Sequence, residues 1–236
     1  MRRLKKQSLP VLPWTWPWYA LDGRPLRPLE LFLSRKFSFV YLAVIWAIWF
    51  GWGLGPEHEC IDLGARLKCV GGLWPEEVFS DPLKFLVGII VAPWFHNSWE
   101  HILFVTMGFM IFVQSFEVRT GSIKTILLFF STIALAGILV ALVMNLGEVL
   151  WPDSNLIEQG MGRNWMGGSA GFFGIIGAST HQSKSRAIVP LLAIIFEVWN
   201  SIQSGSSPFT SSAHMVSLLY GYLAWGWWTG AWKAES

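Results

Sequence analysis

Long apolar segments, separated by short polar ones, make up most of this 236-residue chain. A helix needs about 20 apolar residues to cross the hydrocarbon core of a bilayer. The apolar pattern predicts membrane-spanning helices over residues 37–54, 99–116, 123–144, 168–180, 187–202 and 213–232. The fourth of these is short, and Pro93 separates the second from the apolar residues before it. We therefore expect an all-α, polytopic membrane protein with six transmembrane helices.

The composition supports this class of protein. Hydrophobic residues make up 53% of the chain and charged residues only 14%, whereas a soluble domain carries about 25% charged residues. The 16 tryptophans suit a protein with two membrane–water interfaces. The net charge of +2, with no basic stretch interleaved with aromatic residues, argues against nucleic acid as a partner. The expected surroundings are the lipid bilayer.

The basic residues predict the orientation and the domain boundaries. Residues 1–36 hold eight lysines and arginines among prolines and tryptophans, and either lie at the cytoplasmic membrane surface or form a disordered tail. Residues 37–232 form the six-span domain, and residues 233–236 are a short cytoplasmic tail. With the amino terminus inside, 13 basic residues fall on the cytoplasmic side and four outside. We expect a multi-pass protein of the cell membrane with both termini cytoplasmic.

The loop after the first predicted span, residues 55–84, holds both cysteines of the chain. Cys60 and Cys69 are well spaced for a local disulfide if this loop lies outside the cell. A metal site at residues 57–60 (EHEC) would need a second ligand cluster, and none has matching spacing. We expect neither a metal nor a cofactor.

A serine set among glycines begins the fourth predicted span. In residues 166–178 (MGGSAGFFGIIGA), small residues after Ser169 recur at every third and fourth position, so one helix face carries almost no side chain. Such a face allows another helix to approach closely, and tight packing alone would explain it. The sixth span has a matching stripe beside His214, formed by Ala213, Ser217 and Gly221. Packing of the two stripes against each other would bring the Ser169 hydroxyl close to His214. A nucleophilic hydroxyl needs its base within about 2.6–3.2 Å.

Three polar residues lie in the first turns of the second, fourth and sixth spans. These spans run in the same direction, so His101, Ser169 and His214 should lie at similar depth near the outer face. We predict a Ser169–His214 dyad, with the Ser169 backbone N–H and His101 as oxyanion donors. No carboxylate has an obvious position to orient His214. Glu197, the only acid well inside a span, is expected to extend toward the outer surface.

Several motifs resemble those of the rhomboid intramembrane serine proteases. Residues 96–104 (HNSWEHILF) look like the family's HxxxxHxxxN motif, residues 167–170 (GGSA) like GxSG, and residues 213–221 like AHxxGxxxG. Residues 116–121 (FEVRTG) resemble the short loop after the family's second span. The similarity covers roughly residues 85–232 and keeps the motif order.

The resemblance implies a six-helix rhomboid-like bundle and a serine endopeptidase. Its activity would be cleavage of the transmembrane segment of a protein substrate near the outer membrane face, without a cofactor. Carried over by position, Ser169 is the nucleophile and His214 the base, while Phe173 matches the aromatic residue that packs on the base. The residues implied to form or support the oxyanion hole are His101, His96, Gly167 and Gly168.

The chain departs from the family pattern at four points. Val105 stands where the motif has asparagine, Ala170 replaces the glycine after the serine, and Ser217 replaces the first glycine after the histidine. The first loop has no Trp-Arg pair. Losing an oxyanion donor costs about 2.7–4 kcal/mol of transition-state stabilisation, which Thr106 or His96 would have to supply.

Three rival interpretations remain open at this stage. The first is a rhomboid-like pseudoprotease that binds transmembrane clients without cutting them, which Val105 motivates. The second is an α/β-hydrolase, because residues 167–171 also fit G-x-S-x-G, but that motif needs a preceding strand. The third is a transporter or channel, although no span carries paired acids or a run of charges.

Overall fold

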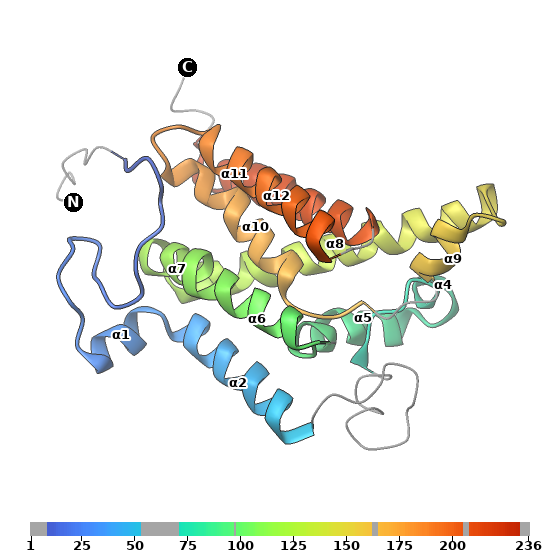
Figure 1. The fold of residues 1–236 in the computed structure, drawn as a ribbon, viewed down its shortest axis with the longest axis horizontal. Coiled ribbons are helices and arrows are strands. Elements are labelled where there is room, and N and C mark those ends of the chain that lie inside the picture. Colours follow the sequence, from blue (N-terminus) through green and yellow to red (C-terminus); the bar gives the residue numbers. More distant parts are fainter. Residues whose placement is uncertain (1–8, 53–70, 97, 162–164, 205–207, 232–236) are drawn as a thin grey trace.

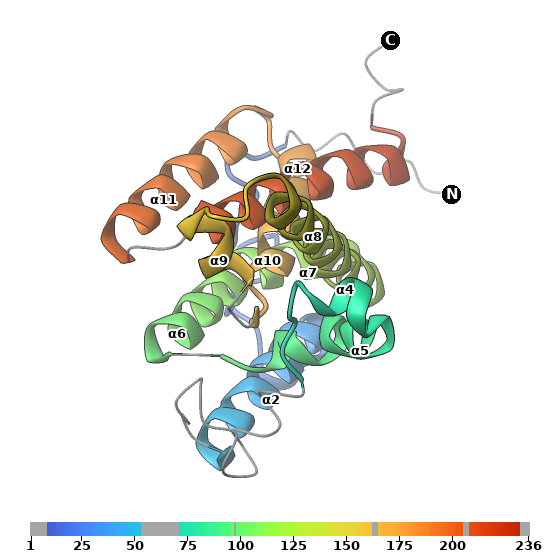
Figure 2. The ribbon, with the colours of Figure 1, turned by 90° about the vertical axis from the view of Figure 1, so that its right-hand side faces the viewer.

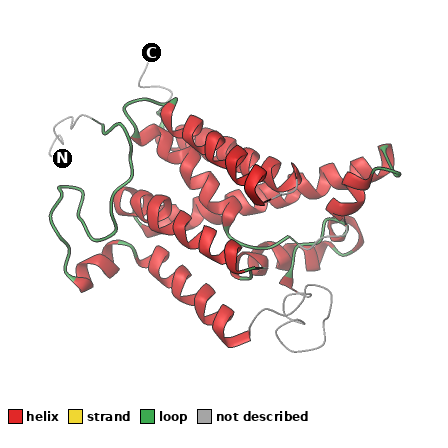
Figure 3. Cartoon of the chain, viewed as in Figure 1, coloured by secondary structure: helices red, strands yellow, loops and turns green. Residues whose placement is uncertain are grey.

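A computed structural model of the chain describes residues 9–52, 71–96, 98–161, 165–204 and 208–231. Within these residues the protein is helical, and its only β structure is two isolated bridges (Figure 3). The predicted all-α class is therefore confirmed for the described part of the chain. Cys60, Cys69 and the EHEC sequence at 57–60 lie outside the described residues, so the disulfide and metal predictions there stay predictions.

Figure 1 shows the order of the helices along the chain. The amino-terminal half contains α1 (Pro28–Ser34), α2 (Lys36–Trp52), α4 (Glu77–Ser80), α5 (Pro82–Val91), η1 (Ala92–Trp94), α6 (Trp99–Gly108), η2 (Phe109–Val113) and α7 (Gln114–Thr120). The second half contains α8 (Ser122–Leu150), α9 (Asn155–Met161), α10 (Ser169–Ser179), η3 (Thr180–Gln182), α11 (Ile188–Ser204) and α12 (Pro208–Thr229).

Helix α10 lies in the middle of the bundle. It packs chiefly against α12 and α8 and also contacts α11, α6 and η2 (Figures 1 and 2). All its residues except Ala170 are buried, which agrees with a sequence that is apolar or small on every side. The helix that carries the serine motif is thus enclosed by protein.

Glycines bring α10 and α12 together at backbone distance. A side chain at Gly177 would collide with the Leu218 carbonyl, and one at Gly221 with the Gly174 carbonyl. Only hydrogen at these positions leaves room for the neighbouring backbone. The close approach predicted from the two small-residue stripes is therefore confirmed.

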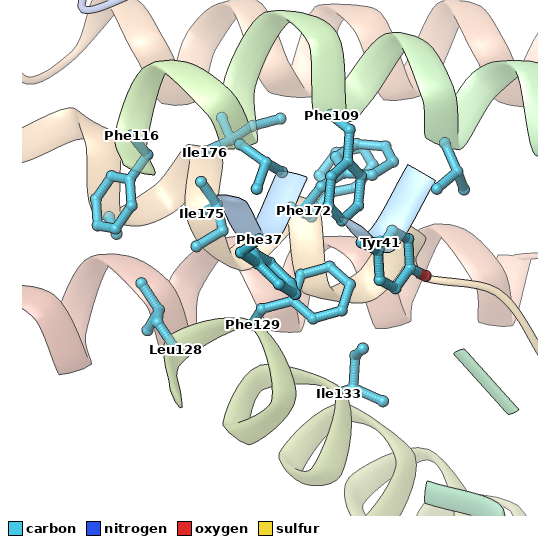
Figure 4. Packing of buried hydrophobic residues seen from close by; sticks show 14 of the residues in the cluster. Phe37, Tyr41, Phe109, Phe116, Leu128, Phe129, Ile133, Phe172, Ile175 and Ile176 are labelled. Carbon is cyan, nitrogen blue, oxygen red and sulfur yellow. The ribbon is translucent and has the colours of Figure 1, made fainter. Parts of the chain in front are cut away.

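Aromatic rings fill the space between α2, α8, α10 and the helix pair α6–η2. The Tyr41 and Phe109 rings stack with centroids 4.3 Å apart, and Phe129 meets both rings edge-on (Figure 4). Phe37 and Phe172 complete this part of the main cluster. Such pairs stabilise the core beyond the area that they bury. This core fixes α10 relative to the amino-terminal helices.

Among the described residues, two helical stretches are long and apolar enough to cross a bilayer by themselves, namely Trp99–Thr120 and Ser122–Leu150. A third is added if α1 and α2, bent by 94°, count as one span. Large apolar side chains are exposed on the outer sides of α8 and α11, as expected where lipid replaces water. The protein is thus a membrane protein, and the count of six spans stays a prediction.

Two predicted loops are partly helical. Helix α8 continues six residues beyond Met144, because the Asn145 amide donates to the carbonyls of Ala141 and Pro75 and so satisfies its polar group inside the fold (2.8 Å each). Helix α12 begins at Pro208 instead of Ala213, since proline is well suited to the first helical position.

The amino-terminal segment is attached to the bundle from Leu9 onward. The Lys184 N–H donates to the Pro10 carbonyl (2.7 Å), and the Thr15 N–H to the Ser115 hydroxyl (2.8 Å). Trp14 packs edge-on against Phe112. The disordered-tail alternative is therefore wrong for the described part of this segment.

Candidate active site

The serine motif turns sharply into α10. Gly167 has φ +98°, a conformation that side chains rarely adopt, and its N–H donates to the Ala92 carbonyl (2.9 Å). A side chain at Gly167 would collide with the His101 ring, and one at Gly168 with the Tyr41 hydroxyl. Ser169 is the first residue of α10, so its N–H is not needed by the helix.

Ser169 and His214 are in direct contact. His214 Nε2 lies 3.0 Å from Ser169 Oγ, and both side chains are buried, with exposed fractions of 3% and 8% for the two residues. The Phe173 ring, one turn after the serine, stacks on the imidazole with centroids 4.3 Å apart and planes 8° apart. The stacked ring limits rotation of His214, so its Nε2 stays directed toward the hydroxyl.

Glu197 lies on the other side of His214. Its Oε2 is 3.0 Å from His214 Nδ1, and the Glu197 residue is only 2% exposed, so the expectation that it extends toward the outer surface is wrong. The ring N–H is not aligned with the oxygen, and neither carboxylate oxygen has a hydrogen-bond partner among the described residues. The missed signal is the buried stripe of α11, where Val189, Ala193 and Glu197 recur every four residues.

A cavity of about 110 Å³ adjoins this group. His101, Ser169 and His214 all line it, together with apolar residues of α5 and α8 such as Phe85 and Ile133. The structure thus brings the three residues from the predicted first turns to one place. The volume is enough for several water molecules.

Two neighbouring histidines lie at one side of the site, and His101 of this pair lines the cavity. Ser98 caps α6 by accepting the His101 N–H (3.1 Å), which fixes the start of that helix. The His96 and His101 rings meet edge to face, with centroids 5.0 Å apart. His96 lies in the connection between η1 and α6, outside the Trp99–Thr120 span. Burial, and then the nearby His101, lower the pKa of His96 well below its usual value, so it is neutral at physiological pH.

The position of the family's asparagine does not face the cavity. Val105 is fully buried in the main core cluster. Its neighbour Thr106 is also engaged elsewhere, since its hydroxyl donates to the Ile102 carbonyl (2.7 Å) and accepts from the Trp46 indole (3.1 Å). The expectation that Thr106 could serve as a replacement donor is therefore not supported by its contacts.

The α/β-hydrolase interpretation fails on the fold. Ahead of the serine, Trp165 makes only an isolated bridge with Leu73, and the flanking described segments are helices. A nucleophile elbow needs a strand of a larger sheet at this place. The G-x-S-x-G match at 167–171 is therefore coincidental.

Comparison with known families gives one result. Residues 84–231, well over half of the chain, match the sequence model of the Rhomboid domain. Searches of curated proteins and of solved structures found no match. The matched region contains Ser169, His214, Glu197, His96 and His101. The chain therefore belongs to the rhomboid family.

Proposed function

We propose that this protein is an intramembrane serine endopeptidase that cleaves the transmembrane segments of membrane proteins. The observation that carries the proposal is the 3.0 Å contact between His214 Nε2 and Ser169 Oγ beside a cavity inside a helical bundle. A hydroxyl becomes a useful nucleophile when a base lies within hydrogen-bond reach. Family membership supports this activity, because rhomboid proteins act on transmembrane substrates within the bilayer.

In the proposed reaction Ser169 Oγ attacks the scissile carbonyl carbon and its proton moves to His214 Nε2. The tetrahedral intermediate collapses as His214 gives this proton to the leaving nitrogen, so the C–N bond breaks and an acyl-enzyme remains. Water then attacks the acyl carbon, with His214 again accepting a proton and returning it to Ser169 Oγ. The cavity beside the serine supplies space for this water.

The oxyanion of the intermediate would be held by the Ser169 backbone N–H and the His101 side chain. The Ser169 N–H lies at the amino terminus of α10, where the helix leaves N–H groups free and its dipole favours negative charge. His101 lines the same cavity. His96 supports His101 through their ring contact, Gly167 leaves room for the His101 ring, and Gly168 leaves room for the Tyr41 hydroxyl at the start of α10.

The proposed membrane arrangement has six spans within residues 37–232 and both termini in the cytoplasm. Segment 1–36 would lie at the cytoplasmic surface and 233–236 would form the tail. The distribution of basic residues supports this orientation. In this orientation the first turns of α6 and α10 would lie near the outer face, where the end of a substrate's transmembrane segment would enter the site.

A catalytically impaired client-binding protein is the second candidate. It is favoured by Val105, which leaves the oxyanion hole without the family's amide, and by the engagement of Thr106 with Trp46. Retention of the Ser169–His214 contact argues for the protease instead, because client binding alone does not require it.

The test is labelling of the purified full-length protein by a fluorophosphonate probe, which reacts with activated serines. We expect labelling of wild type, none of Ser169→Ala, and a rate lowered by about 10⁴-fold or more in His214→Ala. Ser179→Ala is the matched control, since Ser179 is buried near the far end of the same helix, where its hydroxyl only donates to Ile176. Folded wild type that does not label would favour the client-binding alternative.

A further inference from the structure

We propose that Glu197 is a positioning residue for His214, so that the reaction runs on a Ser169–His214–Glu197 triad. The inference rests on the proposed function and goes beyond the Ser169–His214 dyad predicted from the sequence. Its basis is the contact between Glu197 Oε2 and His214 Nδ1 at 3.0 Å, with both side chains at most 4% exposed.

The two ring nitrogens of His214 have separate tasks. Nε2 must accept the serine proton, so in the resting state the ring's single proton has to lie on Nδ1. A buried N–H without an acceptor is costly, and the carboxylate oxygen 3.0 Å away becomes the acceptor that removes this cost when the contact aligns. Glu197 thereby selects the tautomer in which Nε2 is free to act as the base.

Glu197 has little structural reason to be where it is. It lies in the middle of the apolar helix α11, whose neighbouring residues Ile195 and Val198 face outward. Neither of its carboxylate oxygens is hydrogen-bonded within the described part of the chain. Buried carboxylates inside membrane proteins are rare and generally functional. The single close partner is the imidazole that the mechanism needs.

The imperfect alignment of the contact agrees with this role. Catalytic hydrogen bonds are often poorly aligned in free enzymes and tighten when substrate binds. When Ser169 transfers its proton, His214 becomes positively charged, and the attraction to the adjacent carboxylate then rises. Glu197 would thus stabilise the imidazolium that forms in the transition state, without itself accepting the proton.

Other titratable groups near His214 are few. His101 faces the same cavity from α6, and His96 stands beside it. From α8 and α5 the cavity wall receives only apolar residues and glycines, and from α10 only Ser169 and Ala170. Glu197 is therefore the one acidic group among the described residues that lies against the imidazole.

The experiment measures the rate of fluorophosphonate labelling between pH 5 and pH 9. For Glu197→Gln we expect a plateau rate lowered by about 10²–10⁴-fold, because the amide neither selects the tautomer nor stabilises the cation. The pH profile of labelling should also move toward lower pH, since the imidazolium loses its counter-ion. Glu197→Asp should recover part of both effects. Trp199→Phe, on the outward face of α11, is the matched control and should behave as wild type.

A purely structural glutamate would change the folded fraction and leave the pH midpoint in place, which would overturn the proposal. If Glu197→Gln labels as wild type does while His214→Ala does not, the dyad stands and the triad is wrong. ¹⁵N NMR of histidine-labelled protein reads the tautomer even in a protein that does not label. We expect the His214 proton on Nδ1 in wild type and a shift toward Nε2 in Glu197→Gln; equal populations in both would contradict the inference.

Discussion

Two glutamates are buried to the same degree at different places in the bundle, and their surroundings differ sharply. The Glu117 carboxylate on α7 accepts the N–H groups of Phe37 (2.8 Å) and Ser38 (2.9 Å) and the hydroxyls of Ser38 (2.7 Å) and Ser122 (2.6 Å). Glu197 has only the unaligned contact with His214. A carboxylate whose oxygens are all occupied holds elements in place, whereas one with free capacity can respond when a neighbour becomes charged.

The region around Glu117 is built as a joint between helices. Its carboxylate caps the first turn of α2, where the helix dipole favours negative charge. Arg35, just before α2, is fully buried and donates to the Gln114 side chain (2.6 Å) and the Tyr19 carbonyl (2.8 Å). These bonds connect α2, α7 and the amino-terminal segment. We therefore expect this region to determine stability and the Ser169 region to determine activity.

The largest expected effect is that of Glu117→Ala on stability. It leaves two helix N–H groups and two hydroxyls without their acceptor in a buried site, and we expect the free energy of unfolding to fall by about 3–5 kcal/mol. The measurement is denaturant-induced unfolding in detergent.

Glu197→Ala is the matched variant, because it removes an equally buried carboxylate. Its unfolding free energy should change by less than about 1 kcal/mol, or rise, since groups at functional sites are often unfavourable for stability. Equal losses of unfolding free energy in the two variants would show that the different hydrogen bonding of the two carboxylates does not affect stability.

The sequence predicts the Ser169–His214 pair better than it predicts the position of Glu197. Ser169 and His214 could be identified from the sequence because small residues at fixed spacing indicate which helix faces meet. The structure confirms that these two faces are in contact. The position of Glu197 depends on how α11 is rotated about its axis. Periodicity places Val189, Ala193 and Glu197 on one face, but a polar residue on that face could equally have been turned toward lipid headgroups. Only the packing of α11 against α10 and α12 determines that Glu197 lies against His214.

Helix ends were less predictable for the same reason. Asn145 is polar and predicts a loop, yet its amide finds two carbonyls inside the fold. Gly147, which weakens a helix in water, lies where a side chain would strike Ile157 of α9. Tertiary contacts thus override local preference at this end of α8.

Gly221→Ala tests whether the α10–α12 contact holds the site together. The added methyl group would strike the Gly174 carbonyl, and because backbone cannot yield locally, the helices must separate. We expect a loss of about 1–3 kcal/mol in unfolding free energy together with a labelling rate lowered at least tenfold. Gly51→Ala on α2 is the control, since no atom of the described part of the chain lies within 4 Å of the added methyl group. Wild-type labelling by Gly221→Ala would mean that the close approach is not needed for the Ser169–His214 contact.

The smallest expected effect concerns acid sensitivity near the site. Burial lowers the pKa of His96 in the folded protein, whereas in the unfolded chain it titrates near its ordinary value of about 6.5. Above that pH both states are neutral at His96. Just below it mainly the unfolded state binds the proton, so stability is lost at up to about 1.4 kcal/mol per pH unit, or at most about 2 kcal/mol by pH 5.

The measurement is the unfolding free energy at pH 7 and pH 5 for wild type and His96→Phe. The phenyl ring preserves the aromatic contact with His101 but cannot titrate, and the hydrogen bond of His96 to the Trp94 backbone is lost at both pH values, so it cancels in the comparison. The variant should therefore lose less stability than wild type between the two pH values, by at most about 2 kcal/mol. An identical loss in both proteins would show that His96 is protonated without disturbing the fold, and that acid acts on the bundle elsewhere.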